Sequence, residues 1–174
     1  MKQLLVAFTA LIATTVFVAA HQFEKSGLLI VHPWTRATPE GATVGAGYLT
    51  ITNNGKETDR LTGGAFEGAD HVEIHEMKMD GDKMTMRQFK DGVEIQPGAT
   101  VKFNPGSYHM MLMGLKKPIA KGPNIKGSLT FEKAGSVDID YKVENIGAMD
   151  SSDADTGKGD MKMDDSKMMH DHMQ

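Results

Sequence analysis

The chain has 174 residues and a formal net charge of −4 at pH 7, with no cysteine but 14 methionines and 7 histidines. The acidic balance and the lack of a basic cluster argue against nucleic acid as a partner. Without cysteine the fold has no disulfides and a metal site has no thiolate. This excludes a cysteine zinc site, an iron–sulfur cluster and a blue-copper centre.

The N-terminal segment, residues 1–20, carries Lys2 followed by an uninterrupted run of apolar and small residues. The run ends in Val18, Ala19 and Ala20, a small-residue cleavage pattern, and no stop-transfer pattern follows it. We therefore expect a secretory signal peptide, a periplasmic location and no membrane insertion after cleavage. A retained membrane anchor is the alternative, although the run is short for a spanning helix.

The following segment, residues 21–147, has the size of one ordinary domain. Short stretches rich in Val, Ile, Thr, Tyr and Phe are separated by Gly, Pro, Asn and Asp, and no stretch shows a useful helical period. This pattern predicts an all-β fold, an antiparallel β-sandwich or barrel. The expected strands are 28–34, 46–52, 72–79, 84–89, 100–103, 108–115, 126–132 and 137–143.

Two of these strands are separated by Asp80-Gly81, a strong two-residue hairpin signal. With this pair as the loop, His75 lies directly opposite Met86, and Met77 lies opposite Met84. Directly paired side chains share a face, with Cβ atoms about 5 Å apart, which is close enough for both to bind one metal ion. A slip by one residue would move one strand's side chains to the other face.

A second group of donors lies in the strand 108–115. The strand period of two places His109, Met111 and Met113 on one face. Pro105-Gly106-Ser107 marks a turn just before them, so we expect His109 near a strand start, at the rim of the sandwich. A rim position suits a site that exchanges metal with a partner.

Four of these residues, His75, Met86, His109 and Met111, make a soft and neutral ligand set that selects Cu(I) over harder divalent ions. We expect them to form the primary Cu(I) site. A single methionine in a strand is more often core filler than ligand, but packing explains poorly why methionines recur here at a spacing of two. We expect the other strand methionines to lie in the core or beside the site, with metal binding as the alternative: Met77, Met79, Met84, Met110 and Met113.

The other histidines of this domain have different expected roles. His32 and His71 have no methionine at strand spacing and are expected to be structural or hydrogen-bonding. If cleavage follows Ala20, His21 becomes the N-terminus, where its amine and imidazole together chelate Cu(II). A copper oxidase with such an N-terminal histidine site would need a further well-placed histidine, and His32 is the near candidate.

The C-terminal segment, residues 148–174, is dominated by Asp, Ser, Gly, Lys and Met and has no core-forming run, which predicts a flexible, disordered tail. Polar tracts of Met and His are typical of metal binding. We expect a secondary site there for a further copper ion, as Cu(II) or as a second Cu(I). A soluble extension with incidental methionines is the alternative. The expected tail ligands are Met161, Met163, Met168, Met169, His170, His172 and Met173.

The spacing of the primary ligands is specific. Ten residues separate His75 from Met86, and His109 is followed at a spacing of two by Met111. These spacings resemble the metal motif of the periplasmic copper chaperones called PCu(A)C, although the gap between Met86 and His109 is one residue longer than in that motif. The resemblance covers nearly the whole of 21–147 and includes residues 31–37, 45–48, 72–77, 84–87 and 106–115.

The resemblance implies a cupredoxin-like β-sandwich that carries Cu(I) on two His and two Met, without enzymatic activity. It also implies delivery of the ion to the dinuclear copper A centre of cytochrome c oxidase. The copper-accepting partner would be subunit II of the oxidase or another assembly chaperone. Some members of this family carry a Met/His-rich C-terminal extension, and this chain is similar to them.

Besides the copper oxidase considered above, two other functions compete with this one. In a periplasmic copper buffer or detoxification protein, the tail would sequester several ions and prefer no acceptor, whereas a carrier binds one ion tightly and surrenders it to a specific partner. Electron transfer, which a sandwich of this kind also suggests, is opposed by the missing cysteine because blue-copper sites need that thiolate.

Overall fold

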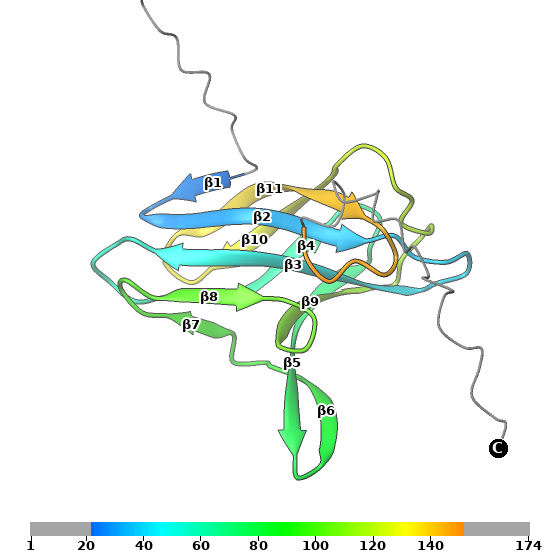
Figure 1. The fold of residues 1–174 in the computed structure, drawn as a ribbon. Helices are drawn as coiled ribbons and strands as arrows, with labels where there is room; N and C mark the ends of the chain where they lie inside the picture. Colours follow the sequence, from blue (N-terminus) through cyan, green and yellow to red (C-terminus); the bar gives the residue numbers. More distant parts are fainter. Residues whose placement is uncertain (1–21, 152–174) are drawn as a thin grey trace, which may run out of the picture.

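The computed structural model describes residues 22–151, which form an all-β sandwich without a helix (Figure 1). The expected all-β, cupredoxin-like class is confirmed, and this part of the chain holds no helix long and apolar enough to cross a membrane. The strands are β1 (Gln22–Lys25), β2 (Leu28–Arg36), β3 (Val44–Asn53), β4 (Asp59–Phe66), β5 (His71–Asp80), β6 (Lys83–Gln88), β7 (Val93–Ile95), β8 (Thr100–Phe103), β9 (Tyr108–Met113), β10 (Ile125–Phe131) and β11 (Gly135–Glu144).

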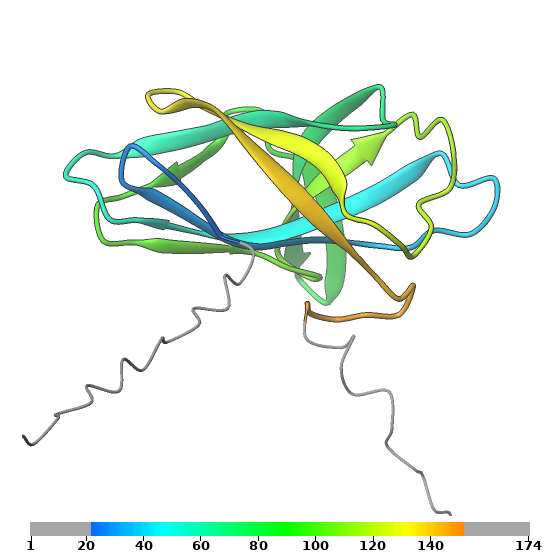
Figure 2. The ribbon, with the colours of Figure 1, turned by 90° about the horizontal axis from the view of Figure 1, so that it is seen from above.

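The strands pair in the order β6-β5-β9-β8-β3-β2-β11-β10-β4-β7, with β1 added beside β2 and a further pairing of β9 with β3. The part from β6 to β2 forms one layer, and the part from β11 to β7 folds over it, so that β10 and β11 cross β2 and β3 at an angle (Figure 2). Two pairings, β2 with β11 and β8 with β9, are parallel, and all the others are antiparallel.

The core lies between the two layers and follows the period of two in the strands. Leu49 and Ile51 of β3 point inward together with Leu28 and Ile30 of β2, and Leu129 of β10 meets them from the other layer. Each such fully buried side chain contributes about 1.5–3 kcal/mol relative to an exposed one. This burial, in a chain without disulfides, holds the sandwich that positions the site.

Three strands were not predicted, and β4 is the informative case. Its centre contains Gly63 and Gly64, and glycine weakens a strand prediction because it has no side chain to pack. The structure shows why a glycine is needed: a Cβ on Gly64 would lie 2.3 Å from the backbone oxygen of Ser128 in the neighbouring strand. The other two, β1 and β7, are short, with 4 and 3 residues.

A bulge in β2 decides which face carries its aromatic residue. His32 has a φ of 52°, and the pairing of β2 with β3 shifts between Val31 and Trp34. The shift turns Trp34 away from the core to the outer face, where its ring lies 4.5 Å from that of Tyr48, centroid to centroid. His32 thus lies within the bulge, with its side chain exposed.

The chain beyond β11 folds back over this outer face. Ala148 is buried against Trp34 and Tyr48, and Arg36 Nε donates a hydrogen bond of 2.6 Å to the Ala148 carbonyl. The first residues of the segment expected to be a tail, 148–151, therefore lie on the sandwich. The expected signal peptide, His21 and residues 152–174, which include all the expected tail ligands, lie outside the described residues.

Candidate metal centre

The hairpin of β5 and β6 has a different register from the one we expected. Its loop is Gly81-Asp82, with Gly81 at a φ of 60°, rather than the pair one residue earlier. His75 therefore lies opposite Gln88, and Met77 lies opposite Met86, so the expected pairing of His75 with Met86 is wrong. In the observed register, each residue of β5 therefore faces a β6 residue two positions further along the chain than we expected. Side chains alternate between the two faces of a strand with a period of two, so this shift leaves every side chain on its predicted face.

The two histidines meet through a different pairing, that of β5 with β9. His75 lies directly opposite His109, and their ring centroids are 6.0 Å apart. Met86 reaches across from β6, so that its Sδ lies 3.3 Å from His109 Nε2. Met111 stands two residues along β9 on the same face, opposite Glu73. The structure thus brings His75, His109 and Met86 together and places Met111 beside them.

These residues lie on the outer face of the sheet. Their immediate neighbours along the same strands, Ile74, Met110 and Leu112, point the other way and are buried in the core. Met110 is therefore a core methionine, as expected. Because the two faces alternate, the candidate ligands stand on a firmly packed support without being part of the core that holds it.

The ring of His109 is held in one tautomer. His109 Nδ1 lies 3.0 Å from the Ser107 carbonyl, and because a carbonyl oxygen only accepts, the Nδ1–H donates. The lone pair of Nε2 is then free on the side of Met86. Burial lowers the pKa of His109 from its ordinary value, an effect that the hydrogen bond to Ser107 partly offsets. The imidazole is therefore neutral at pH 7, the form that binds a metal ion.

The ring of His75 is held by Glu73, a residue that we did not predict. His75 Nε2 donates a hydrogen bond of 2.7 Å to the Glu73 carboxylate, and this bond is the main reason that the pKa of Glu73 lies below its usual value. The other ring nitrogen, Nδ1, is buried and has no hydrogen-bond partner within the described part of the chain. Metal-binding histidines commonly donate the N–H of one ring nitrogen to a carboxylate and bind the ion through the other nitrogen. A metal ion bound at Nδ1 would therefore give this nitrogen a partner.

The spacing of Glu73 in the sequence is a signal that could have predicted its role. Glu73 precedes His75 by two residues, so strand geometry places both on one face. His71, at the same spacing on the other side, is exposed and lies 3.4 Å from Glu73, which agrees with the hydrogen-bonding role expected for it. Within residues 22–151 no group of three or more His, Asp or Glu is arranged to hold a metal ion, so the donors that are gathered here are imidazole and thioether.

The other strand methionines differ in their surroundings. Met77 and Met113 are half-buried on the same face as His75 and His109. Met79 and Met84 are each 54% exposed, so neither is a core methionine, and a position beside the site stays a prediction for both.

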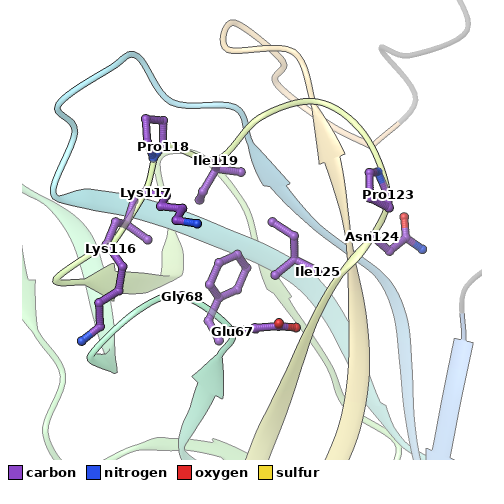
Figure 3. A pocket seen from close by; sticks show the side chains of 11 residues that line it. Glu67, Gly68, Lys116, Lys117, Pro118, Ile119, Pro123, Asn124 and Ile125 are labelled. Atoms are coloured by element: carbon purple, nitrogen blue, oxygen red, sulfur yellow. The ribbon is translucent and has the colours of Figure 1, made fainter.

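A separate cavity of about 460 Å³ lies between the end of β4 and the loop that follows β9 (Figure 3). Its wall is mainly apolar and includes Phe66, Pro118, Ile119 and Ile125. Of the predicted copper ligands that the structure describes, His75, Met86, His109 and Met111, none lines it. The candidate metal centre is therefore a feature of the open sheet face rather than of this cavity.

Two solved structures of one PCuAC domain are similar to this chain. The copper-bound PCuAC domain from PmoF2 is 30% identical, covers 72% of this chain and 98% of its own, and has a TM-score of 0.61. The apo form of the PmoF2 domain is 31% identical, covers 75% of this chain and 99% of its own, and has a TM-score of 0.62.

A family and one curated relative also match. The family described as "Putative lipoprotein LpqE-like" matches residues 28–143, which span β2 to β11. The "Putative lipoprotein Lxx21020" of Leifsonia xyli subsp. xyli is 28% identical over 123 residues, 71% of this chain and 73% of that protein. These descriptions as lipoproteins agree with an extracytoplasmic location. The expected resemblance is confirmed, and the chain belongs to the LpqE-like family and shares its sandwich with the PCuAC domains.

Proposed function

We propose that the protein is an extracytoplasmic copper chaperone, periplasmic in location, that binds one Cu(I) ion through His75, Met86, His109 and Met111. The observation that carries the proposal is the convergence of three donors. Met86 Sδ lies 3.3 Å from His109 Nε2, and His109 is paired with His75, whose buried Nδ1 has no hydrogen-bond partner among residues 22–151. The copper-bound state of the similar PmoF2 domain supports copper as the ion.

The arrangement favours a carrier over an enzyme. The imidazoles of His75 and His109 are largely buried, whereas Met86 is 52% exposed and stands on the solvent side. An acceptor can therefore approach the ion from that side and displace the thioether first. Neutral ligands leave the charge of Cu(I) uncompensated, and the nearby Glu73 carboxylate offsets part of it without binding the ion. A thiolate acceptor is a stronger soft donor than two thioethers, so transfer by ligand exchange is downhill.

The copper A centre of cytochrome c oxidase is the acceptor that we propose, through subunit II or another assembly chaperone. This part of the proposal is supported by the family resemblance alone. A copper buffer is the second candidate function, and one observation favours it: seven Met and His residues are concentrated between Met161 and Met173. We propose that this segment binds a further copper ion.

A copper titration separates the two functions. The mature protein is titrated with Cu(I) against a chromogenic chelator, and the loaded protein is then mixed with an apo copper A domain. We expect one tight Cu(I) at the sandwich and its transfer to the domain. Several ions of equal affinity, none of which moves to the copper A domain, would show that the protein is a buffer.

A further inference from the structure

The hairpin of β5 and β6 extends beyond the sandwich, and its projecting part carries an unusual surface (Figure 1). In the observed register Met79 lies opposite Met84, and Met77 lies opposite Met86. Paired side chains share a face, so these four thioethers form one methionine face. The same face continues into His75, because residues 75, 77 and 79 alternate onto one side of β5.

The opposite face of the hairpin is charged and well paired. Arg87 and Glu76 form an ion pair of 2.8 Å, and the Thr85 hydroxyl donates a hydrogen bond to the Lys78 carbonyl. Lys83 lies opposite Asp80 at the loop. The hairpin is therefore divided into a solvated, charged side and a thioether side.

Packing does not explain the methionine face. Met79 and Met84 are each 54% exposed, and neither belongs to the hydrophobic core. Strands favour β-branched and aromatic residues, so strand stability does not account for methionine at four facing positions. Neighbouring exposed apolar side chains on a projecting element point instead to a function.

We propose that Met79 and Met84 form a second, weaker site for Cu(I) at the tip of the hairpin. The Cβ atoms of a cross-strand pair lie about 5 Å apart, so both sulfurs can contact one ion. Two thioethers without an imidazole form a weaker ligand set than the four donors of the primary site. The tip site therefore captures the ion without retaining it.

The path from the tip to the primary site follows the same face. The pair Met77 and Met86 is about 7 Å further along the strands, and the flexible methionine side chain covers part of that distance by rotation. Met86 is itself 3.3 Å from His109. The ion moves by exchange of one thioether for the next, with no change of its oxidation state. This second step rests on the proposed function, whereas the tip site does not.

The tip site is tested in the full chain by NMR of 13C-methyl methionine during titration with Ag(I), a soft monovalent ion that needs no reductant. We expect the first equivalent to shift Met86 and Met111, and further equivalents to shift Met79 and Met84. If Met79 and Met84 remain unchanged while the methionines of residues 161–173 shift, the tip is not a site. If the signals of Met79 and Met84 shift while those of Met86 and Met111 never do, the tip site is supported and the primary site is misassigned.

The path is tested by a double variant, Met79→Leu with Met84→Leu, which keeps the apolar size and removes both sulfurs. Stopped-flow loading from a small Cu(I) chelate should slow about threefold or more, because a captured ion raises the local concentration beside the primary site. The affinity at equilibrium should not change. Met149→Leu, at an exposed methionine outside the hairpin, is the control and should load like the wild type. An unchanged loading rate in the double variant would overturn the proposed path. Because the copper donor is a small molecule, a slower rate cannot result from the loss of a protein-docking surface.

Discussion

His75 and His109 lie directly opposite each other in the pairing of β5 with β9, with their ring centroids 6.0 Å apart. This relationship joins two strands that are distant in the sequence, and it places both imidazoles on the face opposite the core. Met86 approaches the pair from the edge strand β6. The candidate site is therefore assembled from three neighbouring strands of one layer.

Replacement of His109 and Met111 together by alanine should abolish tight Cu(I) binding by the sandwich and leave it folded. Binding is lost because two of the four donors are removed. The fold survives because Ile74, Met110 and Leu112, which hold these strands to the core, point the other way. His109 is only 6% exposed, so we expect a cost of about 1–3 kcal/mol in the free energy of unfolding. Circular dichroism and chelator competition check both parts; a double variant that is unfolded, or one that still binds tightly without residues 152–174, would contradict the assignment.

Met86 and Met84 offer a matched comparison, because they are 52% and 54% exposed on the same face of β6. Met86→Ala should lower the equilibrium affinity for Cu(I) about tenfold or more, which corresponds to about 1.4 kcal/mol. Met84→Ala should leave that affinity unchanged, because its side chain is one pair further from His109. The two variants are compared by competition with a Cu(I) chelator. Equal losses would mean that the whole methionine face, rather than Met86, completes the site.

Glu73 should act by fixing the tautomer of His75. In the metal-free protein, long-range 1H–15N NMR correlations should show the proton of His75 on Nε2, where the carboxylate accepts it. Glu73→Leu removes this acceptor, and we expect a mixture of tautomers and an affinity for Cu(I) about 10–100-fold lower. Glu73→Gln, which keeps an acceptor oxygen, should lose less affinity for Cu(I) than Glu73→Leu. A proton found on Nδ1 in the wild type would show that this nitrogen is not prepared for a metal ion.

The sandwich should prefer Cu(I) to Zn(II). Zinc is bound by thiolate, imidazole or carboxylate in a closed tetrahedron, and two thioethers meet this requirement poorly. In protein that ends at Ser151, competition titrations should give a much weaker affinity for Zn(II) than for Cu(I). Comparable affinities would indicate that Glu73 or another oxygen donor binds the ion.

Removal of residues 152–174 should lower the copper stoichiometry and slow loading, with no change in affinity at the primary site. The removed segment contains all the expected tail ligands, and its attachment raises the local copper concentration near the sandwich. The cut is placed after Ser151 because Ala148 is packed against Trp34 and Tyr48. Copper content after desalting and stopped-flow loading are the measurements. Equal stoichiometry in both proteins would make the segment a solubility extension.

The sequence by itself determined eight of the eleven strands and the faces of their side chains. Alternation and turn residues are properties of a few neighbouring positions, so strands such as β3 and β9 could be predicted without knowledge of the rest of the chain. For the same reason, His109 and Met111 were placed on one face correctly. The error in the hairpin register moved each partner by two positions, and because the period is also two, it changed the partners of His75 but not its face.

Only the tertiary structure decided which strands are neighbours. The approach of His75 to His109 depends on β5 pairing with β9, and the inclusion of Gly64 in a strand depends on the close approach of Ser128. The turning of Trp34 to the outer face depends on a bulge at His32. These features arise from the packing of the two layers against each other, which involves residues far apart in the chain, so no local pattern in the sequence specifies them.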